Sequence, residues 1–441
     1  MHELSLVVGS ESLVLHGPLA AGALRGARYA PGAAEGDEVN ERLELALEGT
    51  QEQLDEALGR LGRLLGLAKA AAGSANAEWG YLCAAAVPGS SWRSRLLAGW
   101  LEFPENGGAA RVRGRLAVLL HVRRAAWWEG SETSLPLSSL HGSRVTAGLA
   151  WTNHNDGGHA STAFIAGEDI AGDQPAPARL ELSAATGAAG TVWVGLNQGS
   201  DPAGLPSSWQ AEAAAPGSGV TGSVAADGAA SGGQVLNLTW TGSDSTTLAI
   251  WALSPTLLAG LGGRAFFSLL RLGALPLEST LWAWWRLSYT AGSKVTVWEG
   301  AGRYLSTSSL EQELGALALP PWRSPAGLAS PALQLELMVQ GQGGAHALSM
   351  DELLLLPMDG WRKYSPLLAA GQSLGLRDDS ERGVLLGLAN ALPTHAAEGP
   401  GFWLWPGRAA QFVLALSQGA ASSTAVSGAI QVFYRPRRAW L

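Results

Sequence analysis

The chain has 441 residues, a mass of 45.6 kDa and a formal net charge of −8 at pH 7, with 47% hydrophobic and 15% charged residues. This composition excludes an intrinsically disordered chain, and the negative charge argues against binding to a nucleic-acid backbone. The length allows roughly two to four domains. The single cysteine, Cys83, excludes an intramolecular disulfide, and its small apolar neighbours predict a buried, unreactive thiol.

Targeting signals are not evident in the sequence. The first residues lack a basic segment followed by an apolar one, so we expect no signal peptide. No stretch of about 18 apolar residues runs without a charge or a glycine, so we expect no membrane insertion. The sequence therefore predicts synthesis in a host cytoplasm.

The first 70 residues predict strands followed by one long amphipathic helix. Residues 3–15 read as a hairpin, and residues 41–48 alternate polar and apolar as a half-buried strand does. Thr50 and Gln53 have the spacing of a capping box, so the helix should begin there and extend to about residue 68. Its apolar face is predicted to consist of Leu54, Leu58, Leu61 and Leu65.

The rest of the chain reads as short strands between glycine-, serine- and threonine-rich turns, a spacing typical of sandwiches and barrels. The predicted fold is mainly β: a multi-domain β-sandwich or jelly-roll protein with one helix. A weak likeness between two segments, after Arg179 and after Trp285, favours a duplicated jelly roll. The predicted domains are 1–145, which we expect 361–441 to complete, then a first jelly-roll-like sandwich over 146–257 and a second over 258–360.

A glycine-rich segment near residue 342 lies between two apolar runs. The first run alternates from Leu333 to Val339, and the second spans Leu353 to Leu356. We interpret the pair as the closing hairpin of a jelly roll, with Asp351 and Glu352 at the mouth of the second run.

Two polar loops are the candidates for metal binding. Residues 152–159 combine two histidines with Asp156 and two asparagines, donors that suit Ca²⁺ or Zn²⁺, although a solvated interdomain loop is the favoured interpretation. Residues 168–173 hold three carboxylates, among them Asp173, which we interpret mainly as a turn, with calcium binding as the alternative. No metal and no cofactor is predicted.

Catalytic motifs are absent from the sequence. It contains no nucleophile elbow, zinc-binding helix or phosphate-cradling loop. We therefore predict that the chain is not an enzyme, and we keep a glycoside hydrolase with paired carboxylates as the less favoured alternative.

Tryptophans and arginines mark possible contact surfaces. Trp282 and Trp284 should share one face of a strand, with Trp285 on the other; the favoured interpretation places the pair in a sandwich core, and the alternative is stacking against sugars. A subunit interface is the interpretation for Trp403 and Trp405. The basic cluster near the chain end is either a solvated tail or pairs with acids of a neighbouring subunit; it consists of Arg435, Arg437 and Arg438.

Three segments together resemble structural proteins of tailed-phage and prophage tails. Residues 170–180, IAGDQPAPARL, look like the Gly-Asp-x-Pro-Ala-Pro segment that leads into a jelly roll in such proteins. Residues 39–45, followed by the leucine-rich helix, are similar to their opening domain, and Tyr434 to Arg438 resembles their final strand and Arg-Pro-Arg tail. Distal tail and baseplate proteins of this kind form rings around the tail tube, and many carry inserted carbohydrate-binding modules.

The resemblance implies a virion structural protein of a phage tail or tail-like particle, which forms a ring or collar and displays jelly-roll modules. Its expected partners are further copies of itself in a homo-oligomeric ring, other tail proteins and host-surface glycans, with no nucleic acid. Its expected location is the tail of the virion. The alternative is a carbohydrate-binding adhesin or lectin-like protein.

Overall fold

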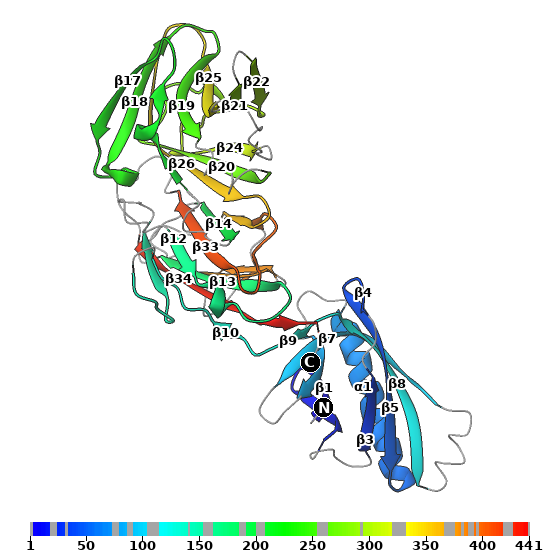
Figure 1. Ribbon diagram of the computed structural model, residues 1–441. Helices are drawn as coiled ribbons and strands as arrows, with labels where there is room; N and C mark the ends of the chain where they lie inside the picture. Colours follow the sequence, from blue (N-terminus) through cyan, green and yellow to red (C-terminus); the bar gives the residue numbers. More distant parts are fainter. Residues whose placement is uncertain are drawn as a thin grey trace. The chain divides into compact units, whose positions relative to one another are not determined.

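The computed structural model describes most of the chain and shows a mainly β protein (Figure 1). The chain divides into two compact units: unit 1 comprises 1–133, 171–176 and 434–441, and unit 2 comprises 134–170 and 177–433. The described residues are 3–17, 24–30, 34–72, 79–85, 91–103, 114–139, 142–152, 162–184, 191–199, 208–253, 263–291, 294–319, 332–365, 375–380, 383–386, 392–393, 397–417 and 427–439.

Unit 1 is built on a 10-stranded antiparallel sheet with the main order β2-β1-β6-β7-β8-β5-β3. Apolar side chains from these strands and from one helix form a single core. The strands are β1 (Glu3–Val8), β2 (Glu11–His16), β3 (Leu24–Ala30), β4 (Ala34–Glu35), β5 (Glu38–Glu48), β6 (Gly80–Ala85), β7 (Trp92–Glu102), β8 (Arg115–Ala125), β9 (Trp128–Glu129) and β35 (Arg437–Arg438).

Strand β5 shows how alternation in the sequence sets the two faces of this sheet. Val39, Glu41, Leu43, Leu45 and Leu47 are buried, and the residues between them are exposed. Successive side chains of a strand point to opposite faces, so one face of β5 packs into the core and the other meets solvent. The predicted half-buried strand over 41–48 is confirmed.

The one long helix of the described residues, α1 (Gln51–Ala72), packs against β7, β6 and β1. The backbone N–H of Thr50 donates to Gln53 Oε1 at 2.9 Å, and the Gln53 N–H donates to Thr50 Oγ1 at 3.3 Å. This reciprocal pair is the predicted capping box, and it satisfies backbone donors at the helix start. The helix runs past the predicted end at residue 68 because its alanine-rich last turn still packs inward; its buried side chains are Leu54, Leu61, Leu64, Leu65, Ala68 and Ala71.

The end of the chain completes unit 1, because β35 pairs with β9. Arg437 is 1% exposed; its guanidinium donates to Glu129 Oε1 at 2.7 Å and lies 4.2 Å from the ring centre of Trp127. Asp173 accepts a hydrogen bond from the backbone N–H of Ala439 at 2.8 Å, which fixes the same segment. A buried arginine between a carboxylate and an aromatic face is internal packing.

The other two arginines of this cluster also contact unit 1. Arg435 pairs with Glu132 at 3.4 Å, and the Arg438 guanidinium lies 4.6 Å from the ring centre of Trp92. The predicted solvated tail is wrong for Arg437, which is buried and pairs with Glu129 of its own chain, whereas Arg438 is exposed and Arg435 partly so. The physical reason is that Glu129 lies buried at the edge of the sheet and needs a cation there.

Unit 2 contains two β-sandwiches, and the prediction of a multi-sandwich β protein is confirmed. The first sandwich consists of an 8-stranded and a 5-stranded sheet (Figure 1). Between them, Phe402 packs edge to face on Phe412. Its elements are β10 (Thr133–Ser134), β11 (Leu149–Thr152), β12 (Thr162–Ile165), η1 (Gly167–Asp169), β13 (Ala176–Ala184), β14 (Val192–Gly199), β27 (Trp361–Tyr364), β28 (Gly375–Asp379), β29 (Gly383–Leu386), β30 (Leu392–Pro393), β31 (Ala397–Glu398), β32 (Trp403–Leu404), β33 (Ala409–Leu416) and β34 (Ser427–Tyr434).

The second, here called the inserted sandwich, spans 208–357 between β14 and β27 of the first. Its two 6-stranded sheets enclose one apolar core. One sheet holds β15 (Ser208–Gln210), β17 (Thr221–Ala226), β18 (Gln234–Thr241), β20 (Ala265–Leu272), β24 (Glu311–Ala318) and β26 (Ala345–Pro357). The other holds β16 (Ala215–Pro216), β19 (Thr246–Leu253), β21 (Trp282–Ala291), β22 (Lys294–Glu299), β23 (Arg303–Tyr304) and β25 (Ala332–Gln340); two short 3-10 helices, η3 (Ala211–Ala213) and η4 (Ser231–Gly233), join strands.

This nesting differs from the predicted division of the chain. Strands β18 and β20 lie on opposite sides of the predicted boundary at 257/258, yet both pair with β26. Most described strands of 361–433 complete the first sandwich, not the N-terminal domain. Turn spacing reveals strands but not their partners, and sandwiches commonly pair strands far apart in sequence.

The glycine-rich segment near residue 342 is not a hairpin turn. Strand β25 pairs with β19 and β21 in one sheet, whereas β26 pairs with β15, β18 and β20 in the other. The two runs therefore face each other across the core as layers of the sandwich. The four consecutive leucines of the second run are buried on both faces, Leu353 and Leu355 in the core of the inserted sandwich and Leu354 and Leu356 against the first sandwich, and a continuous apolar run does not identify the strand's partners.

Candidate functional site

An apolar joint connects the two sandwiches of unit 2. One face of the sheet containing β20 and β26 packs on β14, β27 and β33 of the first sandwich. Phe267 and Trp361 stack across it, with ring centres 4.6 Å apart and planes 13° from parallel. The joint consists of Trp193, Phe267, Leu269, Leu354, Leu356, Trp361, Val413 and Ala415.

A polar cleft of about 350 Å³ opens beside this joint. Both sandwiches contribute to its walls: β14 and β27 from the first, and β23 and β24 from the inserted one. It is lined by Thr191, Trp193, Arg303, Tyr304, Ser306, Ser309, Glu311, Gln312, Glu313, Leu314, Lys363 and Ser365.

Glu313 is the best-anchored side chain of the cleft. Its Oε1 accepts hydrogen bonds from Trp193 Nε1 at 3.0 Å and pairs with Lys363 Nζ at 2.9 Å, while Arg303 Nη1 lies 4.0 Å from Oε2. Two cations and an indole N–H thus surround one carboxylate. These contacts offset the free-energy cost of removing the carboxylate from water.

The cleft wall next to Glu313 is also held in place. The Gln312 side chain accepts from the backbone N–H of Ser306 at 2.6 Å and donates to the carbonyl oxygens of Ser306 at 3.0 Å and Ser309 at 2.5 Å. Tyr304, at the rim, is 66% exposed and packs edge to face on Trp282 with ring centres 4.8 Å apart. The loop and the rim are therefore ordered without a ligand.

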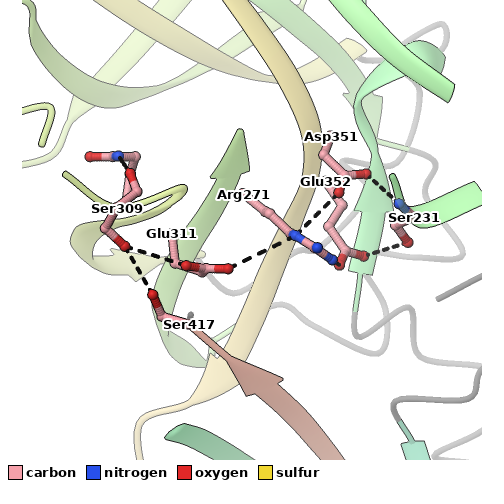
Figure 2. A network of polar contacts seen from close by, with 8 residues as sticks. Ser231, Arg271, Ser309, Glu311, Asp351, Glu352 and Ser417 are labelled. Carbon is pink, nitrogen blue, oxygen red and sulfur yellow. Dashed lines mark hydrogen bonds and ion pairs between the residues drawn. The ribbon is translucent and has the colours of Figure 1, made fainter. Parts of the chain in front are cut away.

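Behind Glu311 the cleft leads to a buried charge network (Figure 2). Arg271 Nε lies 3.9 Å from Glu311 and 3.3 Å from Asp351, and its Nη1 lies 4.0 Å from Glu352. Ser231 completes the network: its N–H donates to Asp351 at 2.8 Å and its hydroxyl to Glu352 at 3.0 Å. Each of the four charged side chains is less than 10% exposed.

A β-bulge explains how two consecutive acids reach one arginine. Arg271 of β20 pairs with Glu352 of β26, but the next residue, Leu272, pairs with Met350. Asp351 is thus the extra residue on β26, and a bulge changes the direction of side chains that would otherwise alternate. On the other side, Arg271 pairs in register with Glu311 of β24.

The excess of acids over cations shifts their protonation. Burial, followed by the charge of Glu352, raises the pKa of Asp351 to about 8, against the opposing effect of Arg271. Burial also raises the pKa of Glu311, and hydrogen bonding by Ser417 and the charge of Arg271 only partly offset it. The network therefore holds protons that solvent-exposed carboxylates would release.

The two faces of the predicted tryptophan strand are exchanged: the face expected in the core is the outer one. Trp285, not the pair, is in the core: it is 1% exposed, and its Nε1 donates to Ser268 Oγ at 2.8 Å. Trp282 and Trp284 share the opposite face and are half-buried, as their spacing predicted. Only Trp282 is connected with the cleft, through Tyr304.

The remaining predicted candidates lie elsewhere. Trp405 is 45% exposed on unit 2 and Trp403 is half-buried. Asp156 lies outside the described residues, and Asp173 fixes the chain end, while Asp169 pairs with Arg144. Among the residues that the structure describes, no group of three or more histidine, cysteine, aspartate or glutamate side chains is arranged to hold a metal ion. Cys83 is half-buried, and burial raises the pKa of its thiol to about 11, as expected for an unreactive cysteine.

Sequence reasoning did not find the cleft or the network. The available signal was the presence of charges in strands that are otherwise apolar: Arg271 is the one charged residue of β20, and Asp351 and Glu352 precede four leucines. Charged residues at buried positions are rare unless they are paired. That signal predicts partners for these side chains but not which strands supply them.

No family profile matches the chain, and no curated protein is similar to it. Within the described part of the chain, no helix has both the length and the apolar character needed to cross a membrane.

Proposed function

We propose that this chain is a structural protein of a phage tail or a tail-like particle. In this proposal unit 1 packs against further copies of itself in a closed ring, and the two sandwiches of unit 2 are the displayed modules. The role is assembly and attachment, without catalysis, in the virion tail beside other tail proteins.

The observation that carries the proposal is the nested insertion of unit 2 into unit 1. Unit 1 takes residues 1–133, 171–176 and 434–441, and β35 closes it on β9. Unit 2 is therefore an insertion, and the inserted sandwich is in turn an insertion within the first. Insertions are tolerated where the surrounding body remains complete, which suits a constant assembly body that carries display modules.

The exposed face of unit 1 offers a surface for contact between copies. It covers the outer side of β5, β7 and β8, each 11 residues long. Trp100 is 54% exposed and stacks in parallel on His121, with ring centres 4.9 Å apart, and His121 Nε2 lies 2.6 Å from Glu102. An exposed, pre-positioned tryptophan among charged residues of both signs is typical of an interface anchor.

The resemblance of residues 39–45 and 434–438 to tail proteins also supports the proposal, because both segments belong to unit 1. A closed ring uses head-to-tail contacts, so the surface around Trp100 would meet a different surface of the next copy.

The test compares two exposed tryptophans, one in each unit. Size-exclusion chromatography with light scattering, together with electron microscopy, should show rings of the parent chain. Trp100→Ala should shift it to monomers, and Trp405→Ala, a matched loss from unit 2, should leave the rings intact. A strictly monomeric parent would overturn the proposal, and rings lost only with Trp405→Ala would place the contact on unit 2.

A further inference from the structure

We propose that the cleft between β24 and β27 binds a saccharide of one or two sugar rings. This inference does not depend on ring assembly, because every residue of the cleft belongs to unit 2. The cleft volume of about 350 Å³ is at the small end of ligand pockets, which span roughly 300–1,000 Å³.

The charges of the cleft favour a neutral polar ligand. Its two cations, Lys363 and Arg303, already face Glu313 at 2.9 and 4.0 Å. Burial keeps Glu311 more protonated than an exposed glutamate, and Arg271 lies behind it. An anionic ligand would have to compete with Glu313 for both cations, and a cationic ligand would meet them as like charges.

The hydrogen-bonding groups of the cleft match sugar hydroxyls. A hydroxyl both donates and accepts, so it can donate to a carboxylate while accepting from an ammonium group. Glu313 and Lys363 present that combination side by side, and the hydroxyls of Thr191, Ser306 and Ser365 line the same space.

An aromatic ring at the rim supplies the apolar part of such a site. Tyr304 is 66% exposed, yet its orientation is set by the edge-to-face contact with Trp282. Sugar rings carry an apolar C–H face, and an exposed aromatic ring that lies beside hydrogen-bonding groups can cover it. Trp193 cannot serve in this way, because it is 3% exposed and bonds to Glu313.

The cleft is also organised before any ligand binds. The joint fixes its two walls relative to each other through Phe267 and Trp361, and Gln312 fixes the loop from Ser306 to Ser309. Binding then orders few side chains, and a site that is already ordered loses less free energy on association.

The experiment uses saturation-transfer difference NMR on the full chain with glucose, galactose, N-acetylglucosamine and maltose as probes. At least one should receive saturation from the parent protein. Tyr304→Ala and Glu313→Gln should each weaken its affinity about tenfold or more, which corresponds to about 1.4 kcal/mol. Tyr304→Phe, which keeps the ring, should bind within about threefold of the parent.

Trp298→Ala is the matched control, because Trp298 is 44% exposed on β22 but does not line the cleft. It should bind the probe as the parent does. Circular dichroism and thermal unfolding establish that each variant is folded; Tyr304 is exposed, so its replacement should leave the core unchanged.

Three results would overturn the proposal. The first is the absence of saturation transfer to every probe at about 10 mM, a concentration that would detect even a dissociation constant of about 1 mM. The second is unchanged binding in both Tyr304→Ala and Glu313→Gln. The third is that no sugar binds but inorganic phosphate does, and that Glu313→Gln strengthens phosphate binding. This result would make the cleft an anion-binding site.

Discussion

Two buried charge clusters, one in each unit, differ in their ratio of acids to cations. In unit 1, Arg124 meets one carboxylate, Glu41, at 2.5 Å and lies 4.4 Å from the ring centre of Trp128. In unit 2, Arg271 faces three acids, Glu311, Asp351 and Glu352. In the cluster of unit 2, burial and the neighbouring charge of Glu352 raise the pKa of Asp351, so this cluster holds a proton that an exposed carboxylate would release. Burial and the excess of acids together make the cluster in unit 2 respond to pH, with burial as the larger cause.

The largest expected effect is that of Arg271→Leu, which removes the cation that faces all three acids. At about pH 8 we expect unit 2 to lose about 5 kcal/mol of unfolding free energy, since buried carboxylates are left without a counter-charge. At about pH 5 the loss should be smaller, because Glu311 and Asp351 take up protons. Urea unfolding followed by tryptophan fluorescence at both pH values measures this difference.

Arg303→Ala is the control for that experiment, because its side chain is 54% exposed and 4.0 Å from Glu313. Solvent-exposed ion pairs contribute about 0–1 kcal/mol to the free energy of unfolding, so this variant should lose little stability at either pH. An equal loss for Arg271→Leu at both pH values would show that the acids of the network do not exchange protons in this range.

The buried pair of unit 1 should also be sensitive to the loss of its cation. Arg124→Leu leaves Glu41 buried without this partner and should destabilise unit 1 by about 3–5 kcal/mol at about pH 8. The neighbouring residue offers a control: Arg123 is 48% exposed and pairs with Glu38 at 3.5 Å, so Arg123→Ala should cost less than about 1 kcal/mol. Chemical unfolding of both variants tests the contrast, and similar losses would contradict it.

A smaller effect follows from the pKa of Asp351. The unfolded chain releases this proton above about pH 4, whereas the folded chain holds it until about pH 8, so the stability of unit 2 should fall as pH rises between these values. Asp351→Asn removes that proton, and the amide oxygen can still accept from Ser231. Relative to the parent, the variant should gain up to about 4 kcal/mol of unfolding free energy between pH 5 and pH 8.5, because about three pH units separate pH 5 from the pKa of about 8 and each is worth about 1.4 kcal/mol.

The groups that face Asp351 are Arg271, Glu352, Ser231 and, at longer range, Glu212. A steeper fall in stability with Asp351→Asn than in the parent would mean that Glu352 carries the proton instead. Differential scanning calorimetry across this pH range separates the two outcomes.

The smallest expected effect comes from a substitution in unit 1 that shows which unfolding transition belongs to which unit. Thr50→Ala removes the capping hydroxyl of α1 and should lower the stability of unit 1 by about 1 kcal/mol. Thr221→Ala, at an exposed position of β17 in unit 2, should change neither transition. If Thr50→Ala moved both transitions equally, the units would unfold together, and the pH effects could not be attributed to unit 2 alone.

Local features of this fold could be predicted from the sequence because neighbouring residues determine them. The capping pair Thr50 and Gln53 fixes a helix start through its own hydrogen bonds, and the alternation from Glu38 to Glu48 fixes the faces of one strand. Both need only the 3.6- and 2-residue periods of helix and strand.

Strand partners could not be predicted in the same way. The two apolar runs on either side of residue 342 are close in sequence, as hairpin strands are, yet they lie in different sheets. The bulge at Asp351 shifts the register by one residue, and no turn signal announces it. Trp285 was assigned to the wrong side because alternation gives two faces without saying which of them is covered.

The buried position of Arg437 has a consequence for how the chain is made. Its partner, Glu129, is 308 residues earlier, so at ~5–20 residues per second roughly 15–60 seconds of synthesis separate the two. Until then β9 lacks its pairing with β35 and Glu129 lacks Arg437. A ribosome product cut short before residue 437 would lack both contacts, so the last residues to be made complete the sheet of unit 1.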